Sequence, residues 1–420
     1  MNLRKFVISV LVALSVLPAF ASSILIPMDE SQKNHLKSYG ITFWTLERGI
    51  EVKWLLNYRG GSFMMQYVKD IEDECRIRGV SYEVIADGQA LQIINEISSP
   101  SQNMEVIPMQ KAPKIAVYTP PTKQPWDDAV TMVLAYAEIT YDKLYDVEIL
   151  NGELSKYDWL HLHHEDFTGQ YGKFYRNYQH MPWYQAEVKS NETTAREMGF
   201  LKVSEMKLTV AKTIRDYVAN GGFLFAMCAA TDTYDIALSA ENTDICEHMY
   251  DGDPAAPNMN ESLDFSRTFA FQNFHVEKDP YRYEFSDIDV TDTRKVNMTN
   301  DYFTLFDFSA KWDPVPTMLC QNHTQIVRGF MGQTTAFNKD LIKPEVLIMG
   351  ENKSANEARY IHADYGNGTW TFYGGHDPED YRHAVGDPPT DLNLYPNSPG
   401  YRLILNNVLF PAAKKKKQKT

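Results

Sequence analysis

The sequence predicts an α/β fold, with a parallel sheet flanked by helices, a β-rich insertion, and a small α/β module ahead of it. Three observations predict this fold. Apolar strand-like runs alternate with amphipathic stretches over 114–243, which indicates parallel strands joined by right-handed crossovers. Turn residues and short alternating stretches dominate 244–344, after which the strand pattern resumes. A shorter pattern of strands and helices fills 22–105, which we expect to form the N-terminal module. We expect the main domain to span 112–412.

The N-terminal module is predicted from local pattern alone. Glu51–Leu56 has strand character, and Gly60-Gly61 indicates a turn after it. Met65–Arg78 is predicted to be a helix, and Val80–Ile85 a second strand. Ser98–Pro113 holds three prolines and little periodicity, which is typical of a linker.

The main domain is predicted element by element. The expected strands of its first half are Lys114–Tyr118, Tyr145–Ile149, Trp159–Leu162 and Phe223–Met227. The expected helices are Asp127–Tyr141, Thr231–Ser239 and Val203–Ala219, the last of which ends at a Gly-Gly C-cap. Within the insertion, Phe269–Val276 and Tyr281–Val290 alternate like strands. The closing elements are Glu345–Met349, Arg359–His362, Thr369–Tyr373 and a helix at Arg402–Leu409, with an Asn-Gly hairpin turn between the last two strands.

The first 21 residues predict export. Arg4 and Lys5 precede an apolar run, Phe6–Phe20, and Ala19-Phe20-Ala21 supplies the small-x-small pattern of a cleavage site. A membrane anchor is the alternative, but the run is shorter than the ~20 apolar residues that a bilayer span needs. We therefore expect a cleaved signal peptide over 1–21 in a bacterial protein that is periplasmic or secreted.

The net charge of −14 argues against nucleic acid as a partner, because phosphate binding needs basic surface. The one basic feature, the tail 413–420, is expected to be solvated, with binding to an acidic surface as the alternative. After the leader, no segment is apolar enough to span a membrane. We expect a small-molecule substrate, and the sequence does not indicate the oligomeric state.

Cys228 is the most distinctive candidate residue. An apolar strand runs directly into it and a helix follows, with alanines at positions 226, 229 and 230 keeping the turn uncrowded. This is the layout of a nucleophile elbow, and a helix N-terminus behind the sulfur favours the thiolate. The alternative is a buried structural cysteine. Disulfides are permitted outside the cytoplasm, and at most one can form among Cys75, Cys246 and Cys320.

His376 is the candidate base for such a thiol. It follows the strand that ends at Tyr373, so it is expected at the same sheet edge as Cys228. Glu379 or Asp377 would orient its ring. The alternative is a histidine that only satisfies backbone groups in a glycine-rich turn.

A run of polar residues, His161-Leu162-His163-His164-Glu165-Asp166, ends another predicted strand. Strand alternation places His161 and His163 on one face and His164 on the other. Because adjacent histidines seldom chelate one ion, we expect this run to be a polar loop that lines a substrate site, and we expect neither a metal nor a cofactor. The alternative is a metal-assisted hydrolase that uses His161, His163, Glu165 and His376. The expected substrate-binding residues are Ala229, Thr231, Asp232, His163, His164, Glu165 and Asp166.

Two motifs carry a family resemblance. Asn220-Gly221-Gly222-Phe223 leading to Cys228-Ala229-Ala230-Thr231-Asp232-Thr233, and Gly368–Tyr373 leading to Gly375–Glu379, resemble the ThuA-like branch of the class I glutamine-amidotransferase-like superfamily. The resemblance covers the sheet of the main domain and implies a flavodoxin-like core with a ligand site at Cys228 and His376. ThuA-like proteins usually have His where this chain has Cys228. Class I amidotransferases have a Cys at this position. In their His-x-Glu pair, however, one residue separates His from Glu, whereas two residues separate His376 from Glu379 in this chain.

Over its full length the chain also resembles exported bacterial proteins labelled asparagine synthetase B. The residues lack the features that this label requires: the mature N-terminus falls near Ser22 rather than a Cys, and no Ser-Gly-Gly-x-Asp-Ser loop for ATP is present.

The leading hypothesis is therefore an exported thiol-dependent hydrolase or amidotransferase-like enzyme acting on an amide-type or sugar-derived small molecule. Cys228 would attack, His376 would shuttle the proton, and amides near Ala229 would hold the oxyanion. The alternative is a non-catalytic protein that binds a carbohydrate or a peptidoglycan fragment.

Overall fold

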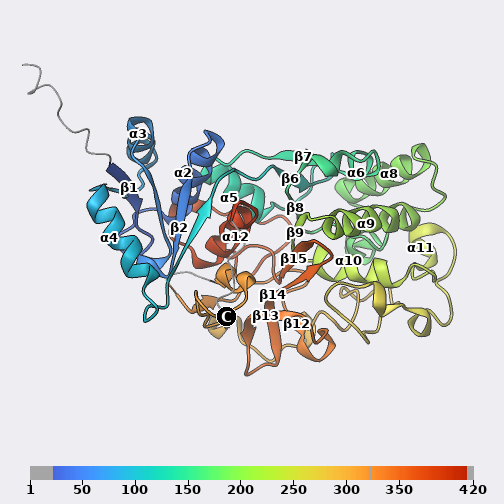
Figure 1. The fold of residues 1–420 in the computed structure, drawn as a ribbon. Coiled ribbons are helices and arrows are strands. Elements are labelled where there is room, and N and C mark those ends of the chain that lie inside the picture. The colour runs from blue at the N-terminus through green and yellow to red at the C-terminus, as the bar shows by residue number, and fades with distance from the viewer. Residues whose placement is uncertain (1–21, 321–323, 414–420) are drawn as a thin grey trace, which may run out of the picture.

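The computed structural model describes residues 22–320 and 324–413. The expected signal peptide, 1–21, and nearly all of the basic tail lie outside these residues. Two sheets organise the described chain, a five-stranded sheet in the N-terminal module and a ten-stranded sheet in the main domain (Figure 1). The α/β class predicted from the sequence is confirmed. None of the helices in the described ranges combines the length and apolar character that crossing a bilayer requires.

The N-terminal sheet has the strand order β4-β1-β3-β2-β5, and all of its neighbouring strands are antiparallel. Its strands are β1 (Ser22–Ile26), β2 (Val52–Leu56), β3 (Ser62–Gln66), β4 (Glu83–Ala86) and β5 (Glu105–Met109). Its helices are α2 (His35–Glu47), α3 (Lys69–Arg78) and α4 (Asp87–Ser98). Two expectations were wrong here. The helix expected at Met65–Arg78 begins only at Lys69, because Met65 and Gln66 belong to the central strand β3, and β5 lies within the expected linker.

The module and the main domain share one continuous apolar core. Helix α2 packs against α5 (Ala129–Ala137) and α12 (Pro399–Leu409) of the main domain. At this junction the Tyr39 hydroxyl donates to Asn406 Oδ1 over 2.5 Å, and Arg402 Nε donates to the Tyr39 oxygen over 3.0 Å. These buried polar groups satisfy one another, so the module is fixed against the main domain by packing and by hydrogen bonds.

One half of the ten-stranded sheet is parallel, with neighbours in the order β15-β9-β8-β6-β7. These strands are β6 (Ile115–Tyr118), β7 (Asp142–Leu144), β8 (Trp159–Leu162), β9 (Phe223–Met227) and β15 (Gly368–Tyr373). Antiparallel strands extend the sheet beyond β15, namely β14 (Glu357–Tyr365), β13 (Leu347–Asn352), β10 (Tyr302–Leu305) and β11 (Ile326–Arg328), while β12 (Phe337–Asn338) pairs with β14. The sheet is therefore mixed, with its parallel half built largely from the predicted strands.

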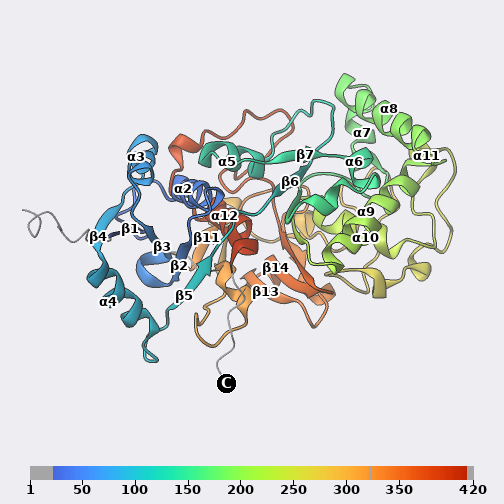
Figure 2. The same ribbon diagram turned by 45° about the horizontal axis from the view of Figure 1, so that its top comes forward.

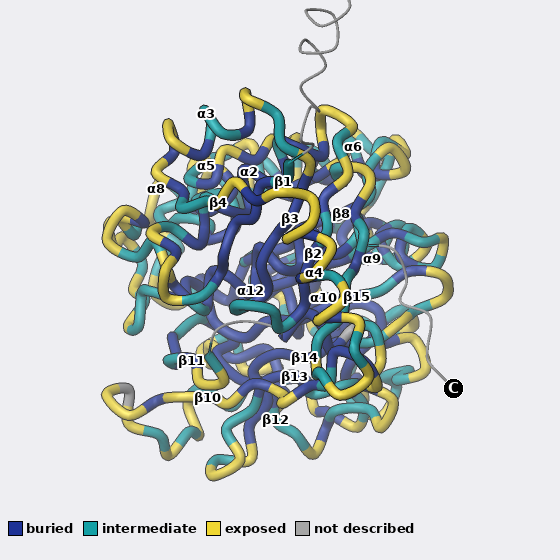
Figure 3. Tube along the Cα trace, turned by 60° about the vertical axis from the view of Figure 1, so that its left-hand side comes forward, coloured by how far each residue is buried: buried dark blue, intermediate teal, exposed yellow. Residues whose placement is uncertain are grey.

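Helices cover both faces of the parallel strands. Helices α5 and α12 lie on one side of them, and α6, α9 and α10 lie on the other (Figures 1 and 2). The helices of the second side are α6 (Asp146–Leu150), α9 (Val203–Ala219) and α10 (Ala230–Ser239), with α7 (Tyr175–Tyr178), α8 (Pro182–Glu197) and α11 (His248–Asp251) beyond them. Because both faces are covered, the central strands are buried (Figure 3).

The expected strand at Tyr145–Ile149 was wrong, because a helix starts there. The carboxylate of Glu148 accepts the backbone N–H of Tyr145 over 2.9 Å and caps α6, and β7 ends just before it. Asp146 in this helix is fully buried, and its carboxylate accepts hydrogen bonds from Lys207 Nζ at 2.8 and 3.1 Å. A capping interaction and a tertiary ion pair thus outweigh the local strand pattern.

The insertion contains less regular strand than its alternation predicts. Residues 269–276 and 281–290 form isolated bridges rather than strands. The carboxylate of Asp235 accepts the backbone N–H groups of Phe269, Ala270 and Phe271 at 2.7 to 2.9 Å. A side chain therefore satisfies backbone groups that a strand partner would otherwise bind.

Candidate functional site

Cys228 lies in a strained turn between β9 and α10. Its φ angle is 50°, in the left-handed region that costs a non-glycine residue about 1 kcal/mol or more. Its N–H donates to the carbonyl of Gly375 over 3.1 Å, and the N–H of Ala230 donates to the carbonyl of His163 over 3.0 Å. The turn therefore fastens the segments that follow β8 and β15 at the same edge of the sheet.

The thiol of Cys228 is enclosed. The residue is 2% exposed, and its Sγ accepts the N–H of Gln333, from the insertion, over 3.3 Å. Burial raises the pKa of the Cys228 thiol to about 11, more than the neighbouring backbone N–H groups lower it. The thiol is thus protonated at neutral pH, since desolvation outweighs the helix N-terminus. The four cysteines, all of which lie in the described chain, are buried and form no disulfide with one another.

His376 follows β15 and contacts histidines rather than the thiol. Its Nε2 lies 2.9 Å from the carbonyl oxygen of Asp127 and 3.5 Å from the carboxylate of the same residue. Its Nδ1 lies 3.1 Å from Nε2 of His163. Because a carbonyl only accepts, Nε2 of His376 carries the hydrogen, and His163 donates to Nδ1. Burial and the neighbouring His163 lower the pKa of His376 to about 3, so its ring is neutral.

The two carboxylates expected to orient His376 lie elsewhere. The Asp377 carboxylate accepts the N–H of Glu379 over 2.8 Å, and the Glu379 carboxylate accepts the hydroxyl of Tyr381 over 2.5 Å. Among the hydrogen bonds found in the described chain, none joins the His376 ring to Cys228, Asp377 or Glu379. The carboxylate in contact with this ring is that of Asp127.

The histidines at the end of β8 point in two directions, as strand alternation predicts. The Asp128 carboxylate lies 3.4 Å from Nε2 of His161 and 3.5 Å from Nδ1 of His163. His164 packs edge-on against Trp126, with 5.3 Å between ring centroids. Burial acts to raise the pKa of Asp128, but the charges of His161 and His163 hold it well below its usual range. Burial acts to lower the pKa of His163, and the Asp128 charge holds it above the usual value.

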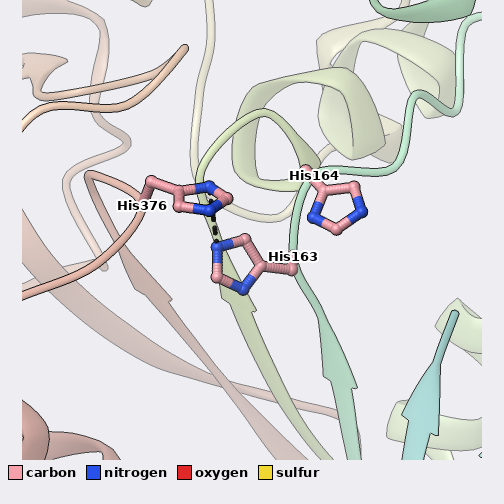
Figure 4. Close-up of side chains that lie close together, drawn as sticks. All are labelled: His163, His164 and His376. Carbon is pink, nitrogen blue, oxygen red and sulfur yellow. Dashed lines mark hydrogen bonds between the residues drawn. The ribbon is translucent and has the colours of Figure 1, made fainter. Parts of the chain in front are cut away.

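Glu165 completes this cluster. One carboxylate oxygen accepts the N–H of His163 over 2.9 Å, and the other, Oε1, lies 3.8 Å from Nε2 of His164. Burial raises the pKa of Glu165 to about 7 and lowers the pKa of His164 well below its ordinary value. Figure 4 shows His163 in contact with His376 and the ring of His164 beside them, and each of the three offers a ligand nitrogen within 4.8 Å of the others.

The other predicted site residues have structural contacts. The Thr231 hydroxyl donates to the carbonyl of Cys228 over 2.6 Å, and Ala229 is buried in the turn. The Asp232 carboxylate accepts the N–H of Thr233 at 2.9 Å and the hydroxyl of Thr334 at 3.0 Å, and burial raises its pKa to about 7.

Asp166 holds its own loop together. Its carboxylate accepts the backbone N–H groups of Thr168 at 2.6 Å and Gly172 at 3.1 Å.

Asp127 and Asp128 contact the site histidines and were not among the residues predicted from the sequence. Asp128 is the N-cap of α5 and accepts the N–H of Thr131 over 2.8 Å. Two adjacent carboxylates between the first parallel strand and its helix must lie at the carboxyl edge of the sheet. Their position between the strand and the helix could therefore have predicted them from the sequence. No sequence signal predicts the contact between Gln333 and Cys228, because that contact depends on how the insertion folds back.

Comparisons with known proteins assign no family to the chain. No protein-family model matches it, and no curated protein matches it either. Among solved structures, two cytoplasmic proteins from Salmonella typhimurium, STM3548 and STM1381, align over 72% of this chain and 100% of theirs, with TM-scores of 0.35 and identities of 11% and 12%. Gan42B, a GH42 β-galactosidase from G. stearothermophilus, aligns over 64% of this chain and 28% of its own, with a TM-score of 0.28 and 10% identity.

Proposed function

We propose that this protein is a hydrolase of small amide-type or sugar-derived molecules, and that His163 and His376 form its acid–base centre. The observation that carries the proposal is the hydrogen bond of 3.1 Å between the two imidazoles at the carboxyl edge of the parallel strands. Ligands of open α/β sheets bind at this edge.

The two rings have opposite protonation tendencies. His376 is held neutral with its hydrogen on Nε2, which leaves a lone pair on Nδ1. His163 is held toward the protonated form by Asp128. A water or substrate group that separates the rings therefore meets an acceptor on one side and a donor on the other. Such pairs of groups with displaced pKa values supply the base and the acid of hydrolytic reactions.

Nucleophilic attack by Cys228 is the second candidate mechanism. The observation that favours it is the φ angle of 50° at the strand-to-helix turn, which is the conformation of a nucleophile elbow. The Sγ atom would need to leave the Gln333 N–H and lose its proton to a base. The elbow and the five parallel strands also support the proposal of a flavodoxin-like core related to the ThuA-like and class I amidotransferase-like proteins. Export to the periplasm or beyond is part of the same proposal.

Variants at the two centres test the proposal against a panel of amides and glycosides. His376→Asn is expected to lower kcat/KM by about 10²- to 10⁴-fold, the usual contribution of a general acid or base. Cys228→Ala is expected to leave it nearly unchanged, as is the control His275→Asn, whose side chain is 75% exposed. Loss of activity in Cys228→Ala would establish the thiol mechanism instead. If no substrate in the panel is turned over and glycans bind unaffected by either variant, the protein is the non-catalytic binder.

A further inference from the structure

We propose that His163, His164 and His376 bind a single divalent transition-metal ion, with zinc preferred, at the carboxyl edge of the parallel strands. The metal site considered as an alternative from the sequence comprised His161, His163, Glu165 and His376. The ligand set inferred here differs from it, and two of its members are adjacent while the third lies over 200 residues away. Binding of the ion does not rest on the proposed function. Because the ion would occupy Nε2 of His163 and Nδ1 of His376, it would replace their acid–base pairing and would not assist it. Neutral imidazole is a preferred ligand of zinc.

The spacing of the nitrogens fits one ion. Nε2 of His163 and Nδ1 of His376 lie 3.1 Å apart, and all three rings offer a nitrogen within 4.8 Å of the others. Zinc bonds of 2.0–2.1 Å in a tetrahedron place neighbouring ligand atoms about 3.3 Å apart. A small movement of the His164 side chain therefore completes a three-histidine site with one position left for water or substrate.

The far side of each of two rings faces an oxygen acceptor. Nε2 of His376 donates to the carbonyl of Asp127, and Nδ1 of His163 lies 3.5 Å from the carboxylate of Asp128. Metal-ligating histidines nearly always make this kind of contact with the nitrogen that does not bind the metal, which fixes the tautomer and turns the other nitrogen toward the ion. The tautomer of His376 leaves Nδ1 free to coordinate. His163 would release the proton on Nε2 when the ion binds.

His164 and Glu165 supply groups that make no hydrogen bond in the described chain. Both ring nitrogens of His164 are buried without a hydrogen bond, and so is Oε1 of Glu165. Leaving such groups unpaired costs free energy unless something binds them. A cation beside the carboxylates of Asp127, Asp128 and Glu165 would also offset their negative charge.

A second set of ligands shares His163, namely Asp128 and His161. Two of its members are engaged on one side, while Nε2 of His161 lies 3.4 Å from the Asp128 carboxylate without a hydrogen bond. Asp128 caps α5, and Nδ1 of His161 lies 3.2 Å from the carbonyl of Phe225. The set that includes His164 is therefore the favoured one, and His161 provides the discriminating control.

The test measures metal binding in the absence of any substrate. Protein purified without chelator is expected to contain close to one zinc per chain by elemental analysis. After removal of the metal, Co²⁺ alone is titrated in, and the intense visible absorption of tetrahedral Co²⁺ with nitrogen ligands is expected. His164→Ala and His376→Asn should each weaken Co²⁺ binding by at least 100-fold. His161→Ala and the surface control His275→Ala should bind nearly as wild type does.

Two results would overturn the site. The first is wild-type protein that neither carries metal nor binds Zn²⁺ or Co²⁺ at micromolar concentrations. The second is Co²⁺ binding that survives His164→Ala but is lost in His161→Ala. Because a ligand variant can also disturb folding, the near-UV circular dichroism of each variant is compared with wild type, and His164→Gln is measured as a conservative replacement. Metal binding without turnover would refute only the proposed hydrolase. Turnover by metal-free protein would refute only a catalytic role for the ion, and not its binding.

Discussion

The thiol of Cys228 offers the clearest test of which centre is reactive. We predict that it is inert toward iodoacetamide at neutral pH. A thiol whose pKa is about 11 is ionised at pH 7 in about one molecule in 10⁴. An exposed cysteine with a pKa of about 8.5 is ionised in about 3%. The thiolate share is thus lower by roughly 300-fold, and with 2% of the residue exposed the rate should fall further.

The assay is timed alkylation between pH 6 and pH 10, with peptide mass spectrometry of the Cys228 peptide. The rate should rise about tenfold per pH unit across this range, because the titration midpoint lies above it. Cys75 is an internal comparison, since it is fully buried and burial raises its pKa to about 12. Protein unfolded in urea gives the rate of an unprotected thiol.

Labelling of Cys228 at the unprotected rate, with a midpoint near or below pH 7, would refute this reasoning. If His376→Asn then slowed the labelling, the two residues would form a dyad in solution. The thiol mechanism would replace the histidine centre as the leading proposal.

Three further predictions concern stability, measured by chemical unfolding. The pKa of Asp232 is about 7 in the folded protein and 3.8 in the unfolded chain, so the protonated carboxyl stabilises the fold below pH 4 and this stability is lost as pH rises toward 7. Asp232→Asn should remove up to about 4 kcal/mol of this pH dependence of the unfolding free energy. An unchanged pH profile in the variant would contradict the prediction. Lys207→Met should cost about 3–5 kcal/mol, because it leaves the Asp146 carboxylate buried without its cation. A loss below about 1 kcal/mol would contradict the stabilising role of this ion pair. Gly332→Ala should cost about 1–3 kcal/mol, since the added Cβ would lie 2.7 Å from the backbone nitrogen of His376. In the control Gly88→Ala the added Cβ meets open space, so stability should change by less than about 1 kcal/mol.

The sequence determined the parallel half of the sheet and much of its edge. Strands β8 and β9 and helix α9 have the bounds that their apolar runs and the Gly-Gly cap predict. The elbow at Cys228 could be located because a buried strand that ends in small residues before a helix has few other structures to adopt. These are local signals, since the residues that fix each element lie within it.

Tertiary structure decided which of the edge residues meet. The sequence places Cys228 and His376 at one edge, but an edge is wide, and only the packed fold brings His376 against His163 and Asp127. A helix forms where a strand was expected at Tyr145–Ile149, and this helix depends on Lys207, which is about 60 residues away in the chain. The environment of the thiol depends on the insertion, through Gln333. Desolvation and hydrogen bonding are set by neighbours from the whole chain, so the identity of the catalytic candidates follows from packing and not from motif spacing alone.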